Sequence, residues 1–318
     1  MPTHPTRKRP LLVAVCLFLG AATGGCGPAA SDDAPPRKFV GLSPLHAVCT
    51  TGMVADMVGR IGGRWVQVDR IMGEGIDPHL FKATPDVIAR LHSADVVFYS
   101  GLHLEGRMTE VLEGLARRKP AIALTSTIPP DKLIQVGDGA HDPHVWFDVA
   151  LWSETSEAVR RFLVEFDPPH RADYEAQAAA YRAELAALDA ECRRRLQALP
   201  EAHRVLVTAH DAFHYFGRAY GVEVRAVQGV STETEAGVRE INDLVAFIAQ
   251  RRIKAVFIEK SVNERNIRAL VEGCRGRGHE VRIGGELYSD SMGPPKTPEG
   301  TYVGMVRANV DAVVRALQ

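Results

Sequence analysis

The sequence predicts an α/β protein of two lobes, each a mostly parallel sheet flanked by helices, with one long linking helix between them. In both halves of the chain, short apolar runs typical of buried strands alternate with helical patterns. Between the halves, apolar residues recur at every third or fourth position, and neither Gly nor Pro interrupts this pattern from His170 to Leu199. We therefore predict an N-terminal α/β lobe at 39–167, a linking helix at 168–199 and a C-terminal α/β lobe at 200–318.

The first 25 residues (1–25) have the pattern of a signal peptide. A basic segment precedes the apolar segment 11–19, which is too short to cross a bilayer as a permanent helix, and small residues follow. Cys26 stands where a bacterial lipoprotein carries its lipid, although Thr23 occupies a position that is usually large and apolar. We predict lipid attachment at Cys26, with simple secretion as the alternative, and a flexible tether at 26–38. The folded part would then lie in the cell envelope, on the extracytoplasmic side of the membrane.

Composition argues against several classes of protein. With 318 residues, 46% of them hydrophobic, the chain can bury a large core. Its 38 basic and 39 acidic residues nearly cancel and form no long basic stripe, so nucleic-acid binding finds no support. The five cysteines are scattered and lack a CxxC pair, which argues against both a disulfide framework and a thiolate zinc site.

Apolar runs and one strong helix start define the N-terminal lobe. Thr84-Pro85-Asp86 combines an N-cap residue, a proline at the first helical position and an acid in the first turn, so a short helix should begin there. An earlier helix should bury Met53, Val54, Met57 and Val58. The predicted strands are 39–42, 66–71, 95–100 and 121–124.

The C-terminal lobe repeats this alternation of strands and helices. Two capping-box patterns, Thr232 with Glu235 and Ser261 with Glu264, predict the starts of two helices. A last helix should bury the apolar stripe that runs from Val303 to Leu317. The predicted strands are 205–208, 222–227, 255–258 and 281–283.

Two Asp-Pro-His tripeptides, at 77–79 and 142–144, stand out in a chain with only twelve histidines. Proline fixes its own φ and forces the preceding residue to be extended, so each Asp-Pro pair orients the following histidine with little freedom. These two histidines, and also His210 and Asp290, are predicted to follow the carboxyl ends of strands. Ligands of open α/β sheets bind at these ends. Three imidazoles and a carboxylate suit one divalent transition metal ion held between the lobes, whereas the alternative is that both tripeptides are ordinary turns. The candidate metal ligands are His79, His144, His210 and Asp290.

Other carboxylates could orient the ligand imidazoles by accepting a hydrogen bond from the second ring nitrogen. Glu105 and Glu259 are candidates, and Glu259 is the better one because it stands at a strand exit in the second lobe; a salt bridge is its alternative role. Asp77 and Asp142 could do similar work or could cap their own turns.

Longer runs accompany these residues: TGMVADM at 51–57, DPH at 77–79, DVVFY at 95–99, DPHVW at 142–146, TAHDAF at 208–213, QGVSTE at 228–233 and GELYSD at 285–290. In this order they resemble the metal-specific solute-binding proteins of bacterial ABC importers, the cluster A-I or TroA-like zinc- and manganese-binding lipoproteins. The resemblance covers essentially everything after the signal peptide. It implies that the family's four metal ligands fall on the four candidates above and that the linking helix is rigid.

The resemblance also implies a binding protein rather than an enzyme. Such a monomer would capture one divalent ion, Mn²⁺ or Zn²⁺ with iron as a further option, and deliver it to an ABC membrane permease driven by a cytoplasmic ATPase. The family's third ligand is Glu in many manganese binders and His in others, so His210 favours zinc. The segment 131–142 lacks the histidine-rich loop of dedicated zinc binders, which favours manganese.

Two other functions remain open at this point. His210-Asp211-Ala212-Phe213-His214 imitates the HExxH helix of zinc proteases, which would make the chain a zinc-dependent hydrolase. In that motif both histidines lie within a helix and Glu is the general base, whereas His210 follows a predicted strand and Asp is shorter. A surface adhesin would use surface patches that a sequence cannot locate.

Overall fold

The computed structural model describes residue 1 and residues 38–39, 44–137 and 139–318. The predicted signal peptide, its Cys26 and almost all of the tether therefore lie outside the described residues. The described residues from Lys38 onward form one compact unit. The boundaries of the lobes at 167/168 and 199/200 stay a prediction.

The N-terminal lobe contains a four-stranded parallel sheet in the order β2-β1-β3-β4. Strands β1 and β3 are central and carry the most buried residues, as expected for apolar strands that are covered on both faces. The strands are β1 Leu45–Cys49, β2 Val66–Arg70, β3 Val96–Tyr99 and β4 Ala121–Ala123.

Side-chain caps fix the starts of three helices in this lobe. The hydroxyls of Thr51 and Thr84 accept hydrogen bonds from the third backbone N–H that follows, and the carboxylate of Asp148 does the same. The cap at Thr84 confirms the predicted helix start. The helices are α1 Gly52–Gly62, α2 Pro85–Ser93, α3 Thr109–Ala116 and α4 Val149–Phe166.

The C-terminal lobe is built on two parallel strand pairs, β5-β6 and β7-β8, and β5 also contacts β7. Its strands and helices occur in the predicted order, and both strand pairs are parallel. The strands are β5 Val205–Thr208, β6 Glu223–Ala226, β7 Ala255–Glu259 and β8 Arg282–Leu287. The helices are α6 His214–Tyr220, α7 Val238–Arg251, α8 Arg265–Gly276 and α9 Tyr302–Leu317.

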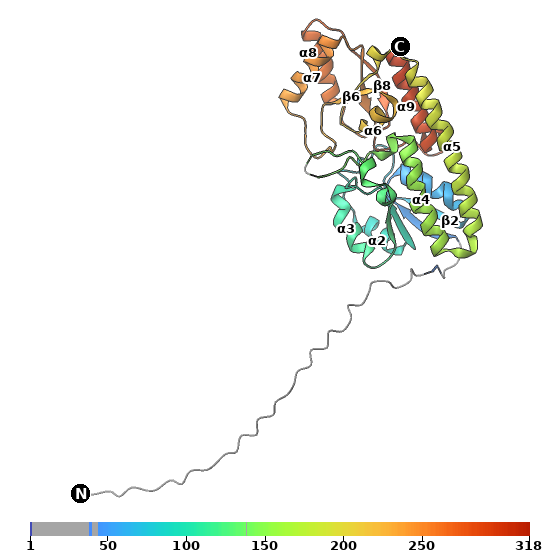
Figure 1. The fold of residues 1–318 in the computed structure, drawn as a ribbon. Coiled ribbons are helices and arrows are strands. Elements are labelled where there is room, and N and C mark those ends of the chain that lie inside the picture. The colour runs from blue at the N-terminus through green and yellow to red at the C-terminus, as the bar shows by residue number, and fades with distance from the viewer. Residues whose placement is uncertain (2–37, 40–43, 138) are drawn as a thin grey trace. The chain divides into compact units, whose positions relative to one another are not determined.

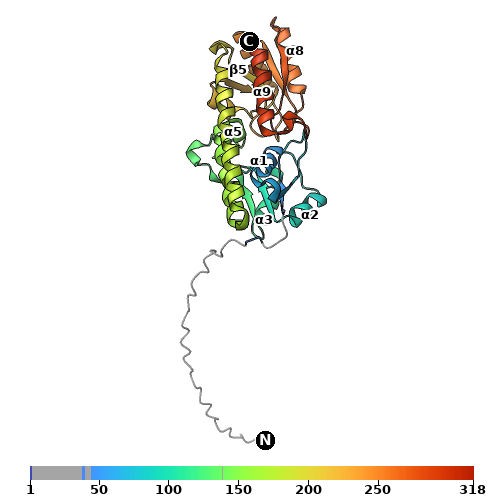
Figure 2. The ribbon, with the colours of Figure 1, turned by 90° about the vertical axis from the view of Figure 1, so that its right-hand side faces the viewer.

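One helix, α5 (Arg171–Gln197), joins the lobes and confirms the predicted linking helix. At about 1.5 Å per residue its 27 residues extend for roughly 40 Å. It packs against α1 and α4 in the first lobe and against α6 and α9 in the second, and Figures 1 and 2 show it running along both lobes. Its buried stripe is the predicted one: Tyr174, Ala178, Tyr181, Leu185, Leu188, Cys192 and Leu196.

One local prediction is not tested and others were wrong. The strand predicted at 39–42 lies mostly outside the described residues and stays a prediction, while the first described strand of the sheet begins at Leu45. Neither capping box forms: α7 begins at Val238, with Gly237 as its N-cap, and α8 begins at Arg265. The hydroxyls of the two predicted caps, Thr232 and Ser261, contact the side chains of Asp77 and Ser289 instead. Within the part of the chain that the structure describes, no helix is both long and apolar enough to cross a membrane.

Candidate metal centre

The four predicted ligands meet at one point between the lobes. One nitrogen from each of His79, His144 and His210 and one carboxylate oxygen of Asp290 all lie within 4.8 Å of one another. All four residues are buried. His79 and His144 come from loops of the N-terminal lobe, and His210 and Asp290 follow β5 and β8 of the C-terminal lobe. The strand exit predicted for His144 is wrong, because this residue follows an isolated bridge between Gln135 and His141.

The Nε2 atoms of all three histidines face the carboxylate of Asp290. Nε2 of His144 lies 3.3 Å from Oδ1 of Asp290, and Nε2 of His210 lies 3.2 Å from Oδ2. Nε2 of His79 lies 3.9 Å from the same Oδ2 and 3.3 Å from Nε2 of His144. When neither nitrogen carries a proton, this close approach places two electron-rich donors side by side, an arrangement that a cation between them would stabilise.

Unsatisfied polar atoms support this interpretation. Nε2 of His210 and both carboxylate oxygens of Asp290 are buried, and none of the described residues forms a hydrogen bond with them. A buried polar atom without a partner costs free energy, so native proteins normally pair such atoms. When the Nε2 atoms of His144 and His210 carry no proton, a divalent ion would supply the missing partner to all of these atoms at once.

Two carboxylates contact the Nδ1 atoms of two candidate ligands, the ring nitrogens that face away from the metal centre. Nδ1 of His144 lies 2.7 Å from Oδ1 of Asp142, and Nδ1 of His210 contacts Oε2 of Glu259. The other oxygen of Glu259 accepts the backbone N–H groups of Ala209 and His210, at 2.8 and 2.9 Å. An imidazole whose Nδ1–H donates to a carboxylate presents the lone pair of Nε2 to a metal, so both contacts fix the useful tautomer.

The other predicted carboxylates lie elsewhere. Asp77 accepts the backbone N–H of His79 at 2.9 Å, so it shapes the turn, as one of its two predicted roles required. Glu105 accepts hydrogen bonds from the hydroxyl of Thr50 and the N–H of Ser100, both at 2.7 Å, and so joins the ends of β1 and β3. It therefore supports the sheet rather than a ligand ring.

These carboxylates change the proton affinity of the site. Burial opposes the charge on His144, but Asp142 and Asp290 outweigh it and raise the pKa of His144 to about 9. Burial opposes the charge on His210 in the same way, but Glu259 and Asp290 raise its pKa well above the usual range. For His79, burial outweighs the attraction of Asp290 and lowers the pKa to about 4. Without metal, two protonated imidazoles therefore face an ionised Asp290, whose pKa they hold far below its usual range despite burial.

The segment that imitates HExxH does not form a zinc-protease helix. His210 directly follows β5, and α6 begins only at His214, so the two histidines do not lie on one helix. His214 instead contacts two carboxylates, with Nδ1 at 3.0 Å from Asp142 and Nε2 at 2.9 Å from Asp211. These contacts raise the pKa of His214 to about 10. Local sequence patterns could not predict the contact with Asp142, because Asp142 is 72 residues away.

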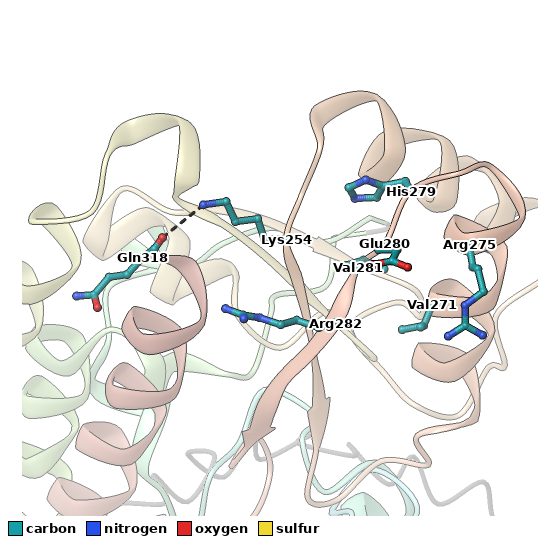
Figure 3. Close-up of a pocket in the computed structure, with 8 residues that line it drawn as sticks. All are labelled: Lys254, Val271, Arg275, His279, Glu280, Val281, Arg282 and Gln318. Atoms are coloured by element: carbon teal, nitrogen blue, oxygen red, sulfur yellow. Dashed lines mark hydrogen bonds between the residues drawn. The ribbon is translucent and has the colours of Figure 1, made fainter.

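A groove and a pocket among the described residues are larger than the metal centre and lie beside it or apart from it. A groove of about 790 Å³ reaches His79 and is lined by loops of both lobes, including Val136, Pro143 and residues 227–231. A separate pocket of about 600 Å³ lies in the C-terminal lobe, beside β8 and the chain end (Figure 3). Its basic side chains are Lys254, Arg275 and Arg282, and Nζ of Lys254 lies 3.5 Å from the main-chain oxygen of Gln318. None of the four predicted ligands lines that pocket.

Comparison with known proteins agrees with this architecture. The chain is 43% identical over 308 residues to the manganese-binding lipoprotein MntA of Bacillus subtilis, which covers 96% of this chain and 99% of that protein. It is 28% identical over 280 residues to the iron ABC transporter substrate-binding lipoprotein MtsA of Streptococcus pyogenes (86% and 89% covered). The solved structure of the periplasmic zinc-binding protein TroA from Treponema pallidum matches with a TM-score of 0.84 and 47% identity, covering 86% of this chain and 99% of that one.

The family comparison covers most of the chain. The model of ZnuA, described as zinc-uptake complex component A, periplasmic, matches residues 47–316. This range includes all four predicted ligands and the linking helix. It confirms the resemblance that the sequence motifs indicated, and the chain belongs to the ZnuA family, whose TroA-like members share its two-lobed fold.

Proposed function

We propose that this chain is an extracytoplasmic substrate-binding protein that captures one divalent transition metal ion and delivers it to an ABC import permease. His79, His144, His210 and Asp290 would be the ligands. The observation that carries the proposal is the convergence of these four buried donors, with the oxygens of Asp290 and one imidazole nitrogen lacking any hydrogen bond. The relatives named as metal-binding or substrate-binding lipoproteins support it.

Binding fits the geometry better than catalysis. A catalytic zinc site keeps one coordination position open for water, with a general base beside it. Here four protein donors surround one point, and the two nearest carboxylates, Asp142 and Glu259, are occupied by hydrogen bonds to His144 and His210. The metal would therefore be cargo rather than a reagent.

The anchoring and the partners follow from the same proposal. We infer that Cys26 carries a lipid and that residues 26–38 tether the lobes to the membrane, since relatives of the chain are named lipoproteins. The protein would act as a monomer and meet the permease, with its cytoplasmic ATPase, at the membrane surface. Mass spectrometry of the protein purified from its native envelope would detect the lipid as added mass on Cys26.

The donor set narrows the cargo to manganese or zinc, with iron as a further option. Relatives are named for manganese, zinc and iron. Three imidazoles and a carboxylate should bind Zn²⁺ more tightly than Mn²⁺ whatever the natural cargo is, because divalent affinities follow the Irving–Williams order. Affinity alone therefore cannot identify the cargo. Elemental analysis of protein isolated from its own envelope is the decisive measurement.

Metal should stabilise the folded chain strongly. An ion that binds only the native state adds about 4 kcal/mol at a thousandfold excess over its Kd. We expect Zn²⁺ or Mn²⁺ added to chelator-stripped protein to raise the melting temperature by at least about 5 °C, since roughly 2–4 °C per kcal/mol is usual for chains of moderate size. Differential scanning calorimetry measures the shift, and Mg²⁺ at the same concentration serves as the control. Equal melting temperatures with and without Zn²⁺, Mn²⁺ and Fe²⁺ would contradict the proposal.

A further inference from the structure

Both Asp-Pro-His tripeptides make the same pair of contacts. In each, Oδ1 of the aspartate accepts the backbone N–H of the histidine two residues later, at 2.9 Å. In each, Oδ2 of the aspartate accepts a hydrogen bond from the other lobe. The donors are the hydroxyl of Thr232, 2.6 Å from Asp77, and Nδ1–H of His214, 3.0 Å from Asp142. One carboxylate thus shapes the ligand turn with one oxygen and holds the opposite lobe with the other.

Further contacts between the lobes surround these two hydrogen bonds. The hydroxyl of Tyr215, next to His214, donates to the backbone oxygen of Asp142 at 2.9 Å and accepts the N–H of Ile134 at 3.1 Å. On the other side, the N–H of Gly75 donates to the hydroxyl of Ser291, one residue after Asp290, at 3.1 Å. The loops that carry His79 and His144 therefore rest on the C-terminal lobe and do not depend on their own sheet alone.

From these contacts we propose that Thr232 and His214 are positioning residues that couple metal affinity to closure of the lobes. This inference rests on the proposed function. Each residue holds an Asp-Pro-His turn in the geometry that aims its imidazole at the metal. When the lobes separate, both hydrogen bonds break and the turns lose their second support. A small separation, which is all that the uninterrupted helix α5 allows, would then be enough to release the ion.

The test compares two substitutions that remove the donors with two that keep them. Thr232→Val and His214→Ala remove the cross-lobe hydrogen bonds. Thr232→Ser keeps the hydroxyl, and His214→Asn places an amide N–H near the position of Nδ1. We expect the first pair to raise the Kd for Zn²⁺ by about 10- to 100-fold, as is usual for residues that orient metal ligands, and the second pair to restore most of the affinity. Competition with a chromophoric chelator measures the Kd. Stopped-flow chelation measures the rate at which metal dissociates, and this rate should be higher in the variants that lack the donors.

Matched controls separate positioning from general destabilisation. Thr127→Val and His92→Ala replace residues of the same types away from the site and should leave the Kd unchanged. The absorption spectrum of bound Co²⁺ reports ligand geometry and should change in Thr232→Val and His214→Ala but not in Thr232→Ser. The melting temperature of the metal-free forms should differ little among all the variants, because the two hydrogen bonds hold loops rather than the core.

The outcomes distinguish this inference from the function on which it rests. If wild-type protein binds Zn²⁺ and His144→Ala does not, while Thr232→Val and His214→Ala bind within about twofold of wild type, the positioning role is overturned and the metal site stands. Loss of affinity in Thr232→Ser and His214→Asn equal to that in the donor-free variants also overturns it, since the hydrogen bonds would then not be the cause. Failure of the wild-type chain to bind any transition metal would overturn both proposals.

Discussion

Substituting His144 by alanine is expected to weaken metal binding at least about a hundredfold, or roughly 2.8 kcal/mol. The change removes one nitrogen donor from the centre. It also leaves the carboxylate of Asp142, which is fully buried, without the imidazole 2.7 Å away. Leaving a buried carboxylate with one partner fewer costs additional free energy and loosens the turn that His144 belongs to.

Competition titration against a chelator of known affinity measures this loss, with Zn²⁺ and Mn²⁺ in parallel. His92→Ala, at an exposed position on α2, is the matched control and should bind as tightly as wild type. The metal-free His144→Ala protein should remain folded by circular dichroism. An affinity within a factor of three of wild type for both ions would remove His144 from the ligand set.

Metal affinity should depend steeply on pH over a range well above that of ordinary histidines. A metal binds neutral imidazole, so protons must leave on binding and the affinity rises with pH until the highest pKa has been passed. The pKa of His144 is raised to about 9, and that of His210 is raised as well. Unperturbed histidines would lose affinity only below about pH 7. Here the loss should already have begun by about pH 9 as the pH falls.

The slope of this dependence follows from the same groups. Below about pH 8 His144 holds a proton in the metal-free site, and His210, whose pKa is also raised, adds a second proton over its own range. Where both are protonated, about two protons should leave per ion, and affinity should fall up to about a hundredfold per pH unit. His79, with a pKa of about 4, adds nothing above pH 5. Calorimetric titration in buffers of different ionisation enthalpy counts the protons. Asp142→Asn should reduce the number, because the carboxylate that raises the pKa of His144 is lost; a proton count near zero at pH 7 would contradict this account.

The order of the elements was predicted well, and the four candidate ligands do lie together, because both leave local signals in the sequence. In α5, buried apolar residues recur every three or four positions. In each Asp-Pro-His turn, three adjacent residues are enough to predict how the histidine is oriented. Contacts between distant segments leave no such signal. Thr232 and Glu235 looked like a capping box, but the hydroxyl of Thr232 is used by Asp77, 155 residues away. The contact between His214 and Asp142 is also a contact between distant segments, so it could not be predicted from local patterns.

The first strand shows a second limit of local patterns. The sequence patterns did not indicate a strand at Leu45–Cys49, which contains His46. In the fold, the backbone N–H of His46 donates to the side chain of Asp95 at 2.8 Å, just before β3. This hydrogen bond uses the backbone of His46 rather than its imidazole, and its acceptor lies 49 residues further along the chain. Its contribution could not be inferred from the residues of the strand alone.

The place of α5 in the core has a consequence for how the molecule can be divided. One continuous hydrophobic cluster contains Leu45 and Phe98 from the first lobe, Leu188 from α5, and Leu206 and Tyr302 from the second lobe. One face of the helix thus covers apolar surface of both halves, so α5 is more than a bridge between two finished domains. Cutting the chain on either side of α5 would expose apolar surface that neither half could cover by itself. Because the described residues from 38 onward pack as one compact unit, we expect that truncation at the predicted borders of the lobes would not yield two independently folded proteins.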